Sequence, residues 1–141
     1  MAFSHGKNTY FSVEDSAGTT LRNISPYCNE ISFPREADLV ETTTFGASYK
    51  TFVAGFTDAT ISVSGNWDPV ATTGPDVVLS GLLGAAGTFG FEFGPAGNTG
   101  TFVKYSGEVI LTNYEVSSAI DGVAEFSAEF QVSGAITRGT F

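Results

Sequence analysis

The chain has 141 residues, 42% of them apolar and 13% aromatic, which is enough for one folded domain with a sizeable core and argues against disorder. Its 15 acidic and 6 basic residues give a net charge of −9, which disfavours nucleic-acid binding because phosphate contacts need cationic side chains. A single cysteine, Cys28, and a single histidine, His5, exclude an internal disulfide and the usual zinc sites.

The beginning of the chain carries no targeting signal. Residues 1–7 lack the basic and apolar regions of a secretory leader, and no apolar run reaches the length of a membrane span. Only 15% of the residues are charged, which is low for a freely soluble monomer and indicates a surface partly covered by partners. We expect a protein that is made in a cytoplasm and is not anchored to a membrane.

The first elements in chain order are short strands. The β-prone runs 8–14 and 19–24 flank a small polar loop at 15–18, a pattern that predicts a hairpin. Residues 27–33 continue as a strand that ends at Pro34, and the next strand, rich in β-branched residues, is predicted over 37–44.

An aromatic segment comes next, over residues 45–58 (FGASYKTFVAGFTD). Gly46 and Gly55 break any regular period, so the segment is predicted as a long loop. Its three Phe and one Tyr are costly to expose, so either the loop covers its own core or another subunit covers it. Residues 59–67 then alternate as a strand that ends at Asp68-Pro69.

One helix is predicted, over residues 75–83. Pro75 suits the first helical position, and either Gly74 or Thr73 can cap the N-terminus. Asp76 lies at the positive end of the helix dipole. An apolar stripe predicts that one face docks on a sheet, and it consists of Val78, Leu79, Leu82 and Leu83.

The C-terminal third predicts two hairpins. Residues 87–93 and 100–105 flank a Gly-rich loop, and the long arms 107–120 and 123–136 flank Asp121-Gly122, a strong signal for a two-residue turn. Each long arm extends roughly 45 Å at about 3.3 Å per residue. Strands of this length suit a barrel or an extended assembly.

A two-residue turn that pairs Ile120 with Val123 assigns every side chain of the long hairpin to a face. The expected core face holds Val109, Leu111, Phe126, Ala128, Phe130 and Val132, interrupted by Asn113 and Glu115. The opposite face is polar and acidic, with Ile110, Tyr114 and Val116 interspersed among residues that include Glu108, Glu125, Glu129 and Gln131.

The charge of this polar face is one-sided, because no Lys or Arg occurs between Tyr105 and Thr137. An ordinary solvent-facing side of an antiparallel sheet accounts for the alternation, but such surfaces usually mix both signs. A surface that faces a polyanion without binding it would have this composition.

No residue set in the sequence supports catalysis. His5 has no Ser or Cys partner in a recognisable nucleophile motif, and the glycines at 81–87 end a helix instead of opening one on a phosphate. Glu125 and Glu129 lie about 13 Å apart along an extended strand, too far for a glycosidase pair. We therefore predict a protein that is not an enzyme and that takes no cofactor or metal.

Two segments of the sequence resemble a known family. GEVILTNYEVSSAIDGVAEFSAEFQVSGAI is similar to the closing hairpin of the major tail tube proteins of long, non-contractile (siphovirus-type) phage tails. DLVETTTFGASYKTFVAGFTDATISVSGNWD resembles their preceding strand, loop and strand, in the same order.

The resemblance implies a mostly β fold, a β-sandwich or partly open barrel with one flanking helix, formed by a single tail tube domain over residues 1–141. It implies rings, with hexameric symmetry, that stack into a tube through which DNA is ejected into the host. The long hairpin would line the lumen with Glu108, Glu125, Glu129 and Gln131. The loop would contact the next ring through Phe45, Tyr49, Lys50, Phe52 and Phe56.

The resemblance also implies partners and a location. The partners are further copies of the chain, together with the tape-measure, tail terminator and baseplate or distal tail proteins, while DNA passes through without specific binding. The location is the tail tube of a virion assembled in the host cytoplasm. A carbohydrate-binding or other ligand-binding β-sandwich is the alternative, with Trp67 and tyrosines stacking on sugar rings.

Overall fold

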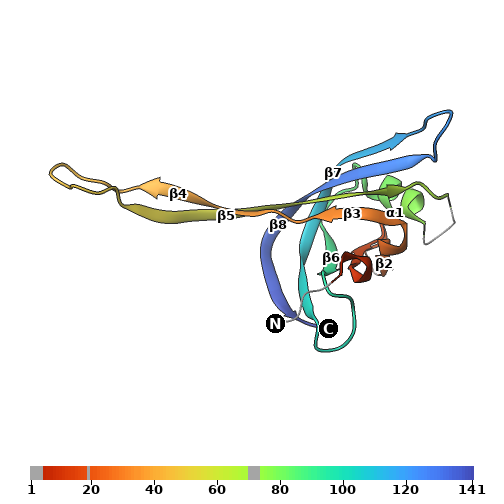
Figure 1. Cartoon of the computed structure of the whole chain (residues 1–141), viewed down its shortest axis with the longest axis horizontal. Helices are drawn as coiled ribbons and strands as arrows, with labels where there is room; N and C mark the ends of the chain where they lie inside the picture. The colour runs from red at the N-terminus through yellow and green to blue at the C-terminus, as the bar shows by residue number, and fades with distance from the viewer. Residues whose placement is uncertain (1–4, 19, 70–73) are drawn as a thin grey trace.

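The computed structural model describes residues 5–18, 20–69 and 74–141, and in these ranges the protein is a curled, mostly antiparallel β-sheet with one α-helix (Figure 1). The strand order is β2-β1-β6-β7-β8-β5-β3, and β4 pairs with β5 off this path. The strands are β1 (Tyr10–Glu14), β2 (Leu21–Asn23), β3 (Cys28–Ser32), β4 (Arg35–Glu41), β5 (Phe52–Asn66), β6 (Phe89–Gly94), β7 (Val103–Ser117) and β8 (Glu125–Thr140). The helix is α1 (Pro75–Leu82), and two 3-10 turns cover Gly6–Asn8 and Ser25–Tyr27. The predicted mostly β architecture with one flanking helix is confirmed.

The core lies on one face of the sheet. Alternate residues of five strands are buried there with the inner side of α1, and the largest fully buried side chains are Phe11, Phe91, Phe126 and Phe130. Gly65 of β5 packs directly on the backbone at the start of β3, because a Cβ at this position would lie 1.9 Å from the Tyr27 carbonyl oxygen. The register between β3 and β5 shifts beside this contact, between Cys28 and Glu30.

The helix forms where the sequence predicts it. Gly74 is its N-cap, while Thr73, the other candidate cap, lies outside the described residues. Of the predicted apolar stripe, Val78, Leu79 and Leu82 are buried, but Leu83 follows the last helical residue and is 46% exposed. No helix in the described ranges has both the length and the apolar character needed to cross a bilayer.

A hydrogen bond fixes α1 against the sheet, because the Tyr114 hydroxyl of β7 donates to Asp76 Oδ1 at 2.9 Å. Burial and this bond together raise the pKa of Tyr114 to about 12. The phenol is therefore neutral and able to donate at every pH at which the protein is ordinarily handled.

Substituting Tyr114→Phe is expected to lower the free energy of unfolding by about 1 kcal/mol at pH 8, the usual contribution of one such bond. A raised pKa stabilises the fold fully below the unfolded value near 10 and loses that effect as pH rises through about 12. The difference between the two proteins should therefore shrink between pH 8 and pH 12. Urea unfolding curves measure it, and a difference that stays constant across this range would contradict the assignment.

The tip of the long hairpin differs from the prediction. The prediction of a two-residue turn at Asp121-Gly122 is wrong. β7 ends at Ser117 and β8 begins at Glu125, so the connection covers residues 118–124. The register is also interrupted between Leu111 and Asn113, where one extra residue of β7 is accommodated as a bulge.

The bulge exchanges the two faces of β7 beyond it. Tyr114 and Val116 lie opposite Ala128 and Phe126, so they belong to the core side of the sheet. Asn113 and Glu115, expected on the core face, lie on the polar face instead. The inward orientation of Phe126, Ala128, Phe130 and Val132 is as predicted, since all four are buried.

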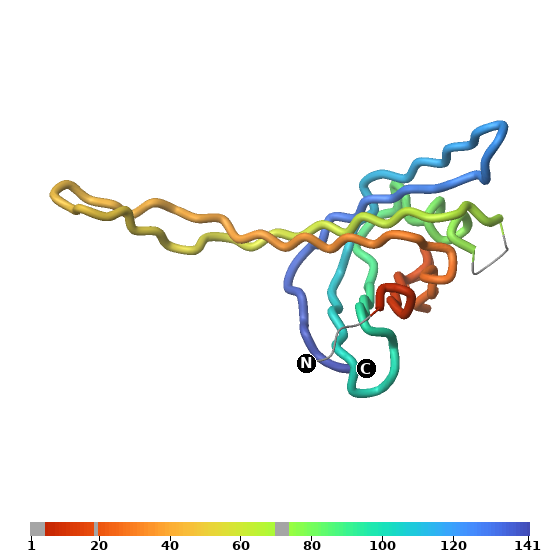
Figure 2. Tube along the Cα trace, viewed as in Figure 1, coloured from red at the N-terminus to blue at the C-terminus, as the bar shows by residue number. Residues whose placement is uncertain are grey.

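The segment predicted as a loop over 45–58 is largely strand. β5 begins at Phe52, and residues 52–59 pair with β4, so the connection covers only 42–51. Gly55 does not end the strand, but the register between β4 and β5 shifts beside it, between Ala37 and Leu39, and a Cβ added at Gly55 would lie 3.3 Å from the Cβ of Asp38. The result is a two-stranded arm, formed by β4, residues 52–59 and their connection, that extends away from the rest of the molecule (Figure 2).

Candidate assembly surfaces

The polar face of the main sheet is built by three adjacent strands, β5, β8 and β7. Across these strands Glu125 lies between Asn66 and Ser117, and Glu129 lies between Ser62 and Asn113. Each carboxylate is thus flanked by hydroxyl or amide side chains instead of another carboxylate. This arrangement spreads negative charge over the face without direct like-charge pairs.

All four residues predicted to face a lumen lie on this side of the sheet. Glu108, Glu125 and Glu129 are exposed, while Gln131 is half-buried and donates from Nε2 to the Ala59 carbonyl oxygen at 3.2 Å and to Asp58. The bulge adds Glu115, which the sequence pattern places on the opposite face. Only the register could have revealed it, since the residue type carries no signal of its own.

The polar face contains no cation in its central strands. β5 has no Lys or Arg, and neither do β7 beyond Lys104 or β8 before Arg138. Lys104 itself is 3.7 Å from Glu92 of β6. The face therefore presents carboxylates without counter-charges, a field that repels phosphate.

The arm exposes apolar side chains over both strands and its tip. All five residues predicted to contact a neighbouring ring lie there and are exposed: Phe45, Tyr49, Lys50, Phe52 and Phe56. β4 adds Leu39 and Val40, two exposed residues that the sequence pattern does not single out. Apolar patches of this kind mark an interaction surface.

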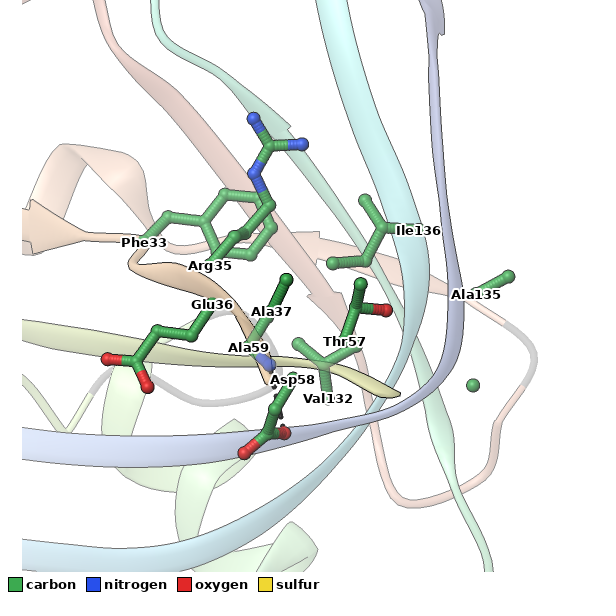
Figure 3. Close-up of a pocket in the computed structure, with 11 residues that line it drawn as sticks. Phe33, Arg35, Glu36, Ala37, Thr57, Asp58, Ala59, Val132, Ala135 and Ile136 are labelled. Atoms are coloured by element: carbon green, nitrogen blue, oxygen red, sulfur yellow. Dashed lines mark hydrogen bonds between the residues drawn. The ribbon is translucent and has the colours of Figure 1, made fainter. Parts of the chain in front are cut away.

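A cavity of about 730 Å³ opens where the arm leaves the sheet (Figure 3). Its apolar lining includes Phe33, Ala37, Ala59, Val132 and Ile136, contributed by the base of the arm and the C-terminal part of β8. Figure 3 shows the Arg35 guanidinium pointing away from the carboxylates of Glu36 and Asp58. That guanidinium lies 4.8 Å from the ring centre of Tyr105 and 5.7 Å from that of Phe33.

Catalytic and sugar-binding roles find little support in this geometry. Burial raises the pKa of the Cys28 thiol to about 12, and its Sγ donates to the Ile24 carbonyl oxygen, so it is not a nucleophilic thiolate. Trp67 packs against the core and its indole Nε1 is shielded from solvent, which leaves it poorly placed to stack on a sugar. The described residues contain no group of three or more His, Cys, Asp and Glu side chains that could hold a metal ion.

Comparison with solved structures identifies the fold. A chain from the tail of an empty gene transfer agent (GTA) particle with C6 symmetry matches with a TM-score of 0.82 and 15% identity, covering 98% of this chain and 100% of that one. The SPP1 tail tube matches with a TM-score of 0.79 and 10% identity, covering 99% and 80%. The sheath-tube complex of an extracellular contractile injection system (PVC) gives 0.69 and 15%, covering 99% and 93%.

These matches define the class of fold, which is that of tail tube proteins of phage-like particles. The fold expected from the resemblance is therefore confirmed. It is shared by the SPP1 tail tube and by a contractile injection system, so it does not by itself select the siphovirus type. No family model and no curated protein matches the sequence.

Proposed function

We propose that the chain is the structural subunit of a siphovirus-type tail tube and has no enzymatic activity. Copies associate into rings of six, the rings stack, and the polar face of β5, β8 and β7 lines the lumen. The observation that carries this proposal is a tail tube fold whose central polar face has carboxylates but no cations. The C6 symmetry of the GTA tail, which shares the fold, supports six subunits per ring.

The lumen assignment gives the carboxylates a physical role. DNA that moves through a tube must not adhere to the wall, and adhesion through phosphates requires Lys or Arg. A wall that carries carboxylates and no cations repels the polyanion along its length, so DNA passes without specific binding. The tube would be part of the virion and would contact tape-measure, terminator and baseplate or distal tail proteins. It would assemble in the host cytoplasm.

Electron microscopy of the purified full chain tests the proposal directly. We expect stacked rings or tubes with a central channel in negatively stained samples at high protein concentration. A protein that stays strictly monomeric at every concentration and salt condition would refute self-assembly into a tube.

Reversing two lumen charges with Glu125→Lys and Glu129→Lys is expected to leave tubes intact and to slow DNA release about tenfold or more. Both side chains are exposed, so the fold should tolerate the change, whereas four units of charge per subunit shift toward attraction of phosphate. The rate of DNA ejection from particles carrying the variant measures the effect.

Two controls separate lumen charge from total charge. Glu125→Gln with Glu129→Gln should give an intermediate rate, and Asp121→Lys, at the tip of the hairpin, should change the rate less than Glu129→Lys alone. Ejection at the wild-type rate from the double lysine variant would show that these carboxylates do not line the channel.

A further inference from the structure

The tip of the arm presents two aromatic rings and a cation. Phe45 and Tyr49 are 108% and 85% exposed, and Lys50 is the only Lys or Arg between Arg35 and Lys104. No acidic residue occurs between Glu41 and Asp58, so the tip is locally positive in a strongly acidic chain.

The tip is ordered by its own hydrogen bonds. Thr42 and Thr51 join across its base, with the Thr42 amide donating to the Thr51 carbonyl oxygen at 2.8 Å and their hydroxyl oxygens 2.9 Å apart. The Thr51 amide donates to Thr43 Oγ1 at 3.0 Å, and Gly46 makes the turn with φ of +86°. A surface held in one shape loses little entropy when it binds.

The lining of the cavity at the base of the arm includes two carboxylates, Glu36 and Asp58, which project from the opposite face of the β4–β5 ladder to Ala37 and Thr57 (Figure 3). Glu36 and Asp58 lie directly opposite each other in the β4–β5 ladder, an arrangement of like charges that destabilises a strand pair. Asp58 accepts hydrogen bonds from the Ala59 amide and from Gln131, whereas Glu36 has no polar partner in the described structure. The nearest guanidinium, that of Arg35, is directed at aromatic rings instead.

The arm of the same molecule cannot fill this cavity. Four residues of β4, 38–41, lie between the cavity-lining Ala37 and the connection over 42–51, which places the start of the tip about 16 Å away at about 3.3 Å per residue. Figure 2 shows the tip at the far end of the arm, remote from the sheet. A tip that enters this cavity must therefore belong to another molecule.

We propose that the occupant is the arm tip of a second copy of this chain. A tip ring, Phe45 or Tyr49, enters the apolar part of the cavity, and Lys50 approaches the carboxylates of Glu36 and Asp58. The volume of about 730 Å³ lies within the range of pockets that enclose whole small molecules, so an aromatic side chain fits. The proposal rests on the proposed function, because it requires that copies of the chain associate.

The contact is directional. Each copy offers one tip and one cavity at opposite ends of its arm, so every contact leaves a free tip and a free cavity for the next copy. A heterologous contact of this kind closes into a ring or continues as a filament. Either outcome is compatible with a tube, and the tip and its cavity become the joint between neighbouring copies.

A charge exchange tests the pairing in the full chain. Lys50→Glu and Glu36→Lys are each expected to reduce the sedimentable, tubular fraction about tenfold, because each places like charges at the contact. Glu36→Lys should at the same time stabilise the isolated subunit slightly against urea, since it relieves the repulsion with Asp58. The double variant K50E/E36K restores opposite charges and should recover assembly.

The matched control is K50E/D121K, which has the same net charge as K50E/E36K but places the new lysine at the tip of the β7–β8 hairpin. We expect it to assemble as poorly as Lys50→Glu alone. Recovery in this control equal to that in K50E/E36K would show that only net charge matters and would overturn the docking.

Cysteine cross-linking gives a second, independent measurement. Lys50→Cys combined with Glu36→Cys should form, on mild oxidation, a ladder of dimers, trimers and longer covalent chains, since the two positions meet only between copies. Either substitution alone should give no ladder beyond a dimer.

The outcomes distinguish the two proposals. Tubes from the wild-type chain, without rescue by the charge exchange and without a ladder, would overturn the docking and leave the tube subunit standing. Failure of the wild-type chain to form any tube would overturn both.

Discussion

Replacing residues 38–56 with an Asn-Gly turn is expected to abolish tube formation and to leave a folded, soluble subunit. Ala37 of β4 and Thr57 of β5 are paired across the arm, so a two-residue hairpin turn can join them without moving the sheet. The replacement removes the exposed apolar residues of both arm strands and the tip. Because a few buried aromatic anchors usually dominate an interface, we expect the protein concentration needed for assembly to rise at least about a hundredfold.

Sedimentation and negative-stain microscopy measure this effect, and circular dichroism confirms that the sheet persists. A matched variant keeps the arm and changes only its aromatic residues, with serine at Phe45, Tyr49, Phe52 and Phe56. It should assemble as poorly as the truncated chain, which would assign the loss to side chains and not to arm length. Normal tubes from the truncated chain would mean that the arm plays no part in assembly.

Substituting Gly65→Ala is expected to destabilise the subunit by about 3 kcal/mol or to prevent its folding. The added Cβ would lie 1.9 Å from the Tyr27 carbonyl oxygen and 2.7 Å from Cys28 Cα, both backbone atoms that no side-chain rotation can move. Relief requires separating β3 from β5, next to the buried core residues Val63 and Phe126. Overpacking of a core typically costs about 1–3 kcal/mol, and this contact is closer than most.

The control is Gly139→Ala in β8, where an added Cβ meets nothing within 4 Å. It should unfold in urea within about 0.5 kcal/mol of the wild-type chain, as surface substitutions usually do. Equal stability of the two alanine variants would show that β3 does not approach β5 as closely as the structure has it.

Much of the fold could be predicted because its local patterns are strong. The alternation of apolar residues in β5 and β8 identifies which side chains are buried, and Pro75 with its apolar stripe identifies α1. The orientation of Glu125 and Glu129 follows from the same alternation, since residues two apart on a strand share a face.

The register at the hairpin tip could not be predicted. A bulge changes the face of every later residue, yet nothing in the sequence near Thr112 distinguishes a strand with one extra residue from a regular one. The Asp-Gly pair suggests a tight turn, but the connection over 118–124 is longer and its tip is formed by a bond from the Gly122 amide to the Ala119 carbonyl oxygen. A regular register therefore places Tyr114 on the polar face and Glu115 on the core face, the reverse of their positions beyond the bulge.

The arm cannot be predicted from the sequence for a different reason. A strand that has only one partner and no buried face lacks the alternation by which strands are recognised, and the apolar residues of 52–59 occur on both sides. Gly55 adds a further sign of irregularity, and the structure does have a register shift beside it, although the strand continues through it. The aromatic content of the segment leaves two alternatives, cover by the chain's own core or by another subunit, and the exposure of Phe45, Tyr49 and Phe56 excludes the first.

The isolation of the arm bears on how growth would begin. A ribbon of two strands without a third strand or a second layer is marginally stable in water. Each tip is held by its own hydrogen bonds, but two free subunits that meet must fix two whole arms at once, whereas a subunit that joins an existing end meets an arm that is already fixed. Elongation would then be faster than nucleation, so a separate initiating platform could decide where and when polymer appears.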